Sequence, residues 1–116
     1  MSIFRWFYSK DSIKRKILDI KVDLKKIVRK KCRERVWVMW HGAYYIDPKH
    51  LAYIAIVRSD AMKDKLNSDV ELNKAMRELM IKHDYPKEAI PEVYMGFESD
   101  ETIKRDSGGD YWLHFK

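Results

Sequence analysis

The sequence predicts an α+β fold: a mainly antiparallel sheet of about four strands, with a long N-terminal helix and a second helix packed on one face. Three observations lead to this fold class. An amphipathic helical pattern opens the chain, short β-branched and aromatic runs follow it, and a second helical pattern separates those runs. The connections between the runs are short, and several runs are direct neighbours along the chain, which favours antiparallel pairing.

The first element is a helix over residues 11–31. Its apolar residues recur at spacings of four and three, which places them on one stripe of the helix surface. They are Ile13, Ile17, Ile20, Leu24 and Ile27. Asp11 or Ser12 can cap the start of the helix by accepting a backbone N–H bond.

Two strands are expected next, over residues 36–40 and 51–58. The first run is β-branched and aromatic, as is typical of strands. Asp47 and Pro48 predict a turn between them, because proline fixes φ and aspartate can bond to the backbone that follows it. The second run is apolar on both faces, which indicates a central strand covered on both sides.

The second half of the chain alternates helical and extended patterns. Ser59 and Asp60 open a helical turn, and Ser68 or Asp69 caps a helix that ends near His83. A strand over 92–98, a short helix and a last strand over 110–115 complete the series.

Length and charge define the organisation of the chain. A chain of 116 residues predicts a single domain, 1–116. Residues 1–35 carry 13 Lys and Arg against 4 Asp and Glu, net +9, whereas residues 36–116 are net −3. The sequence thus joins a basic N-terminal helical arm, 1–35, to an acidic α+β body, 36–116.

The single Cys32 favours the reducing cytoplasm, and no apolar run reaches the ~18 residues of a membrane span.

Enzyme and metal sites find little support in the residue pattern. His41, His50, His83, His114 and Cys32 show no metal-ligand spacing. The cations around Cys32 would lower the pKa of its thiol, but the sequence places no companion histidine beside it. An acid–base site made from His41, His50 or His114 with a lysine has no fixed geometry either. We therefore expect no enzyme, and no catalytic, metal or cofactor-binding residue.

The basic residues of the first helix have several interpretations. The densest group lies in its second half: Lys25, Lys26, Arg29, Lys30 and Lys31. These cations surround a clean apolar stripe, so the plainest account is an amphipathic helix lying on its own acidic body. The alternatives are nucleic acid, whose phosphates the cations would neutralise, and an anionic membrane surface or a protein partner. The stripe also allows a homodimer through the N-terminal helix.

The stretch 97–112 is the densest in charge and in turn residues. Ser99 is a good N-cap, and Asp100 and Glu101 then lie in the first helical turn, where negative charge is favoured. Arg105 follows Glu101 at the favourable i,i+4 spacing. Glu98 has no local partner, so we expect it to face Arg105 or a ligand.

Residues 41–116 resemble a family of small bacterial α+β proteins whose motifs carry no known chemistry. The resemblance rests on "HGAYYIDPKHLAYIAIV" and on a C-terminus with Phe97-Glu98-Ser99, Glu101-Thr102, Arg105, Gly108-Gly109 and Trp112. Asp100 departs from the family, which has glutamine there. Such proteins are similar to the immunity proteins encoded beside polymorphic or contact-dependent toxins.

This resemblance implies a cytoplasmic immunity protein that binds and neutralises a cognate toxin, as in contact-dependent growth inhibition. The rival is a small nucleic-acid-binding protein that uses the basic helix. Aromatic and arginine side chains are the usual energetic anchors of protein interfaces, so they head the candidates for partner binding. The candidates are Trp40, His41, Tyr44, Tyr45, Glu98, Glu101, Arg105 and Trp112.

Overall fold

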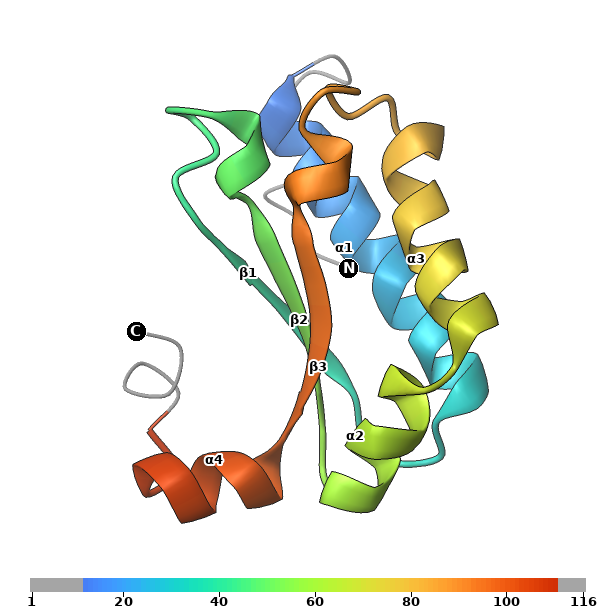
Figure 1. Cartoon of the computed structure of the whole chain (residues 1–116), viewed down its shortest axis with the longest axis vertical. Helices are drawn as coiled ribbons and strands as arrows, with labels where there is room; N and C mark the ends of the chain where they lie inside the picture. Colours follow the sequence, from blue (N-terminus) through green and yellow to red (C-terminus); the bar gives the residue numbers. More distant parts are fainter. Residues whose placement is uncertain (1–11, 111–116) are drawn as a thin grey trace.

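A computed structural model describes residues 12–110 of the chain (Figure 1). Its helices and strands form an α+β fold, as predicted. Their order is α1 (Ile13–Lys31), β1 (Trp37–His41), η2 (Pro48–His50), β2 (Ala52–Val57), α2 (Asp60–Asn67), α3 (Val70–Lys82), η3 (Ile90–Glu92), β3 (Tyr94–Ser99) and α4 (Asp100–Ser107).

The sheet is mixed, so the prediction of a mainly antiparallel sheet is wrong. β1 pairs antiparallel with β2, whereas β2 pairs parallel with β3, and β2 is the central strand. The reason is the connection: α2 and α3 carry the chain back along the sheet, so β3 starts at the same end as β2. Over residues 12–110 the sheet has three strands. The expected fourth strand, 110–115, lies outside the described residues beyond Asp110.

The basic helix α1 docks on the body of its own chain. Ser12 caps its start by accepting a 3.1 Å bond from the backbone N–H of Arg15. Its apolar stripe is buried in the core shared with the sheet; the stripe's fully buried residues are Ile17, Ile20, Leu24 and Val28. The Tyr53 hydroxyl on β2 donates a 2.7 Å bond to the Ile17 carbonyl. The stripe that allowed a homodimer is therefore occupied within the chain.

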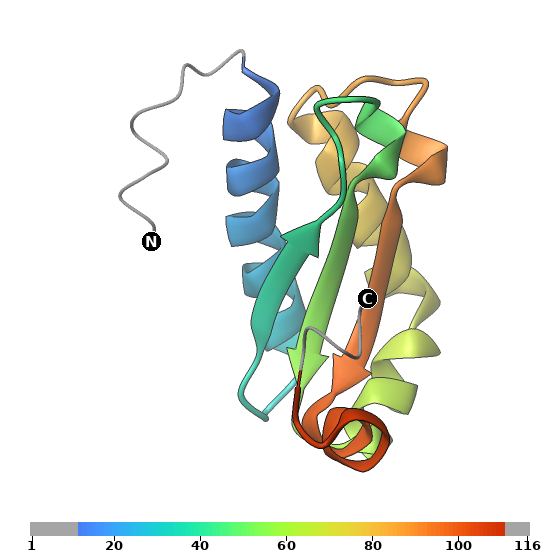
Figure 2. The ribbon, with the colours of Figure 1, turned by 90° about the vertical axis from the view of Figure 1, so that its left-hand side faces the viewer.

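The two faces of the sheet are covered differently. α1 and α3 lie on one face, where Tyr53 and Phe97 enter the main core (Figures 1 and 2). On the other face Ile103 of α4 packs with Ile54 and Ile56 of β2 in a smaller cluster. The expectation that the helices share one face thus holds for α1 and α3 but not for α4. No helix among residues 12–110 is long and apolar enough to cross a membrane.

Candidate functional site

The predicted partner-binding residues fall at opposite ends of the sheet. His41 ends β1 and pairs with Ala52, the first residue of β2, whereas Glu98 pairs with Ile56 near the end of that strand. Trp40, His41, Tyr44 and Tyr45 therefore belong to one end of the molecule, and Glu98, Glu101 and Arg105 to the other. Trp112 lies outside the described residues. No single surface holds both groups.

At the first end the loop after β1 presents an aromatic tip, which we define as Tyr44, Tyr45 and Ile46. The Tyr44 ring packs edge-on against Trp40 and Tyr45, with ring centroids 5.8 and 5.7 Å apart. The Lys14 ammonium of α1 lies 4.1 Å from the centre of the Trp40 ring. Outside this stack Tyr45 is 77% exposed and Ile46 is 73% exposed. The tip thus exposes apolar side chains to solvent, and the packed rings of Trp40 and Tyr44 support them from behind.

The backbone around the aromatic tip is tightly fixed. Gly42 has φ +109°, and a Cβ there would lie 2.0 Å from the His50 carbonyl oxygen, so glycine is required. The Asp47 carboxylate accepts a 3.1 Å bond from the backbone N–H of Lys49 and caps η2, as expected for this turn. The Tyr85 hydroxyl donates a 2.6 Å bond to the Pro48 carbonyl. A loop held in this way loses little freedom on binding.

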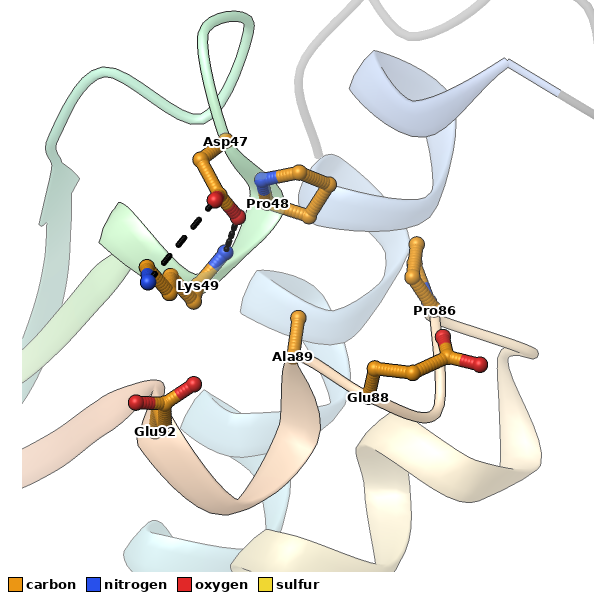
Figure 3. Close-up of a pocket in the computed structure, with 7 residues that line it drawn as sticks. All are labelled: Asp47, Pro48, Lys49, Pro86, Glu88, Ala89 and Glu92. Carbon is orange, nitrogen blue, oxygen red and sulfur yellow. Dashed lines mark hydrogen bonds and ion pairs between the residues drawn. The ribbon is translucent and has the colours of Figure 1, made fainter.

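Beside the tip lies a hollow of about 280 Å³, which we call the acidic hollow (Figure 3). Three carboxylates line it, Asp47, Glu88 and Glu92, and the Lys49 ammonium pairs with Asp47 at 3.9 Å. Pro48, Pro86 and Ala89 complete the wall. Among residues 12–110 no group of three or more histidine, cysteine, aspartate or glutamate side chains is arranged to hold a metal ion. The chemistry of the hollow suits a cationic side chain.

The acidic hollow depends on a partly buried arginine of α3. The Arg77 guanidinium donates bonds of 2.8 and 2.6 Å to the Ile90 and Val93 carbonyls, which ties η3 to the helix. Burial lowers the pKa of Arg77, and backbone carbonyls take the place of a carboxylate partner. Sequence reasoning did not single out Glu88, Glu92 or Ile46 as candidate binding residues, because only the tertiary fold brings η2 beside η3.

At the opposite end α2 and α4 begin side by side, and we call this the α2–α4 junction. The Asp60 carboxylate accepts bonds from the Ser99 hydroxyl (2.5 Å), the Thr102 hydroxyl (2.6 Å) and the Arg105 guanidinium (2.9 Å). In return the Glu101 carboxylate accepts a 2.8 Å bond from the backbone N–H of Asp60. Each helix therefore supplies an acceptor to donors of the other.

The ion pairs at this junction differ from the expected one. The sequence suggested that Glu98 faces Arg105 or a ligand. Instead the Lys63 ammonium lies 3.2 Å from the Glu98 carboxylate, and Arg105 pairs with Asp60. The three donors hold the pKa of Asp60 far below its usual range. Ser99 is fully buried and caps α4 by accepting a bond from the backbone N–H of Thr102, so its hydroxyl is part of the fold.

Along α1 the predicted basic patch is largely solvent-exposed. Lys31 pairs with Asp69 of the α3 cap at 3.6 Å. The remaining four cations of the patch are exposed and have no ion-pair partner among residues 12–110. We call these four cations the basic ridge. They are Lys25, Lys26, Arg29 and Lys30. The ridge lies on the side of α1 opposite the buried stripe, so docking the helix leaves these charges available.

The expectation that neighbouring cations lower the pKa of the Cys32 thiol is wrong. The Cys32 side chain is only 7% exposed, and burial raises the pKa of the thiol although cations surround it in the sequence. The Sγ atom lies 3.6 Å from the Glu34 carbonyl. His83 has a partner on α1, since its Nε2 lies 2.7 Å from the Asp23 carboxylate. His114 lies outside the described residues.

No family model, curated protein or solved structure matches this chain. The family resemblance of residues 41–116 therefore stays a prediction from the residues alone.

Proposed function

We propose that this chain is an immunity protein: a cytoplasmic binding protein that neutralises a cognate bacterial toxin by direct association. The observation that carries the proposal is the aromatic tip, where Tyr45 and Ile46 are 77% and 73% exposed on a fixed loop. Exposed apolar side chains on a rigid support are typical anchors of protein interfaces. The class of partner comes from the resemblance of residues 41–116.

The acidic hollow supports a partner with basic side chains near its contact surface. Asp47, Glu88 and Glu92 line it and Lys49 neutralises only one of them. An arginine or lysine of the toxin could enter the hollow while the aromatic tip packs beside it. Opposite charges at the rim speed association and select the partner, whereas the buried apolar contact supplies most of the affinity.

The test is binding to the protein encoded by the adjacent reading frame, measured by calorimetry with the purified proteins. We expect a stable complex, and Tyr45→Ala with Ile46→Ala to weaken it at least ~30-fold, since an anchor contributes about 2 kcal/mol or more. Val70→Ala with Ile81→Ala is the matched control, because these side chains are also exposed (79% and 62%) but lie on α3. The control should bind like the wild type.

Two results would count against the proposal. One is that the adjacent protein forms no complex and its toxicity in growing cells is unchanged by co-expression of this chain. The other is a complex that survives the tip substitutions with unchanged affinity, which would move the interface to another surface. Because Tyr45 and Ile46 are exposed, the substitutions should leave the free energy of unfolding within about 0.5 kcal/mol of the wild type.

A further inference from the structure

The basic ridge carries more exposed positive charge than the fold uses. Lys25 and Arg29 lie one turn apart on α1, and so do Lys26 and Lys30, so the four cations form two adjoining rows. All four are exposed. Like charges at this spacing repel each other within the helix, so the arrangement works against the helix that bears it.

Several of the other cations of α1 have ion-pair partners, whereas the four of the ridge have none among residues 12–110. Arg15 pairs with Asp19, and Lys16 with Asp84. The nearest acid after the ridge in sequence, Glu34, is engaged elsewhere: its carboxylate accepts bonds from the backbone N–H groups of Arg58 and Ser59 and from the Ser59 hydroxyl. The negative end of the helix dipole favours cations in the last turn, but Lys25 and Lys26 lie before that turn.

We infer that the basic ridge binds the phosphate backbone of nucleic acid, independently of the surface that binds the proposed toxin. The ridge is a line of four exposed cations, and a polyanion is the partner whose charge it matches. None of the large exposed apolar side chains of residues 12–110 lies on α1. A protein interface would need such anchors near its centre.

The burial of α1 argues against a membrane surface as the partner. An interfacial helix inserts its apolar face between lipid headgroups, but the apolar stripe of α1 is already in the core, with Ile20 and Val28 fully buried. The side chains of α1 that are exposed, rather than half-buried, are all charged. Backbone phosphates need only cations along a path, so binding should be independent of base sequence.

Four phosphate contacts give a definite salt dependence. The logarithm of the binding constant should fall with the logarithm of salt concentration at a slope of about −3.6 on duplex DNA, or roughly −2.8 on a single strand. Raising NaCl from 50 to 200 mM should therefore weaken duplex binding ~150-fold. Removing one contact should reduce the slope by about 0.9.

The experiment measures fluorescence anisotropy of a labelled 20-base-pair duplex and a 20-nucleotide RNA of mixed sequence, titrated with the full chain between 50 and 200 mM NaCl. The ridge variant replaces Lys25, Lys26, Arg29 and Lys30 with glutamine. The control replaces four exposed lysines elsewhere, on α2, α3, the loop before η3 and α4, and so has the same net charge. They are Lys65, Lys74, Lys87 and Lys104.

We expect the wild type and the control to bind with the steep slope, and the ridge variant to lose both affinity and slope. Single Lys25→Gln and Lys26→Gln variants should show intermediate slopes. The inference is overturned if no nucleic acid binds at 50 mM NaCl, or if both fourfold variants weaken binding equally, which would indicate net charge rather than the ridge. Binding to vesicles containing phosphatidylserine without binding to nucleic acid would overturn it too.

This outcome is separable from that of the proposed function. The ridge variant keeps Tyr45 and Ile46, and the tip variant keeps all four ridge cations. If the chain binds no nucleic acid, the toxin complex still tests the aromatic tip. If no toxin complex forms, nucleic-acid binding still tests the ridge. Circular dichroism and the urea midpoint of each variant confirm that the exposed substitutions leave the fold intact.

Discussion

Leu24→Ala tests whether α1 is part of the core, on which both the fold and the basic ridge depend. Leu24 is 1% exposed and packs in the main core. Truncating a buried leucine removes apolar contact and leaves a cavity, at a cost of about 2–5 kcal/mol. We take about 3 kcal/mol for a helix at the edge of one core. A chain of 116 residues unfolds with an entropy of about 0.24 kcal/mol/K, so Tm should fall by ~12 °C.

Urea and thermal unfolding followed by circular dichroism measure this loss. Lys25→Ala is the matched control, since it is the next residue along the helix and is exposed; its effect should stay within about 0.5 kcal/mol. If Leu24→Ala unfolds like the wild type, α1 is not docked and the reasoning fails. A loss that changes between two protein concentrations tenfold apart would show that α1 packs on a second copy instead.

Three further predictions follow from single contacts. Tyr53→Phe should cost about 1 kcal/mol in urea unfolding, because it removes the buried bond to the Ile17 carbonyl; a neutral result would show that the bond contributes nothing net. Gly42→Ala should destabilise by about 1–3 kcal/mol, owing to φ +109° and the close His50 carbonyl, with a changed near-ultraviolet signal from the aromatic tip; an unaltered variant would mean the loop is not fixed as described. Since the folded pKa of Asp60 is depressed, its contribution is present above its unfolded pKa of about 3.9 and is lost as pH falls below it. Asp60→Asn should therefore reduce the dependence of the unfolding free energy on pH below about 5, and an unchanged acid slope would assign that dependence to other carboxylates.

The sequence predicted best those structural features that depend on residues close to one another along the chain. Ser12, Ser59 and Ser99 cap their helices, as expected from local side-chain to backbone bonds. The apolar stripe of α1 and the doubly covered β2 also follow from residue periodicity alone. These features depend on spacings of two to four residues, which a single sequence shows directly.

What the sequence missed depends on contacts between distant segments. The direction of β3 follows from the crossover through α2 and α3, and residue patterns within β3 carry no mark of it. Lys63 and Glu98 are 35 residues apart in sequence. Local spacing could therefore suggest only Arg105 as a partner for Glu98. The Cys32 thiol shows the same limit: sequence neighbours suggested a lowered pKa, while burial in the fold raises it. The acidic hollow was not predicted for the same reason, since Glu88 and Glu92 become neighbours of Asp47 only in the folded chain.

The reciprocal bonds at the α2–α4 junction have a consequence for how the protein opens. Each of these helices has only eight residues, too short to be stable alone. Asp60 of α2 holds the hydroxyls of Ser99 and Thr102, and Glu101 of α4 holds the first N–H of α2. Neither helix can unwind without releasing the other's first turn. In native-state hydrogen exchange their amides should thus behave as one cooperative unit, although Asp60 and Ser99 lie 39 positions apart in sequence.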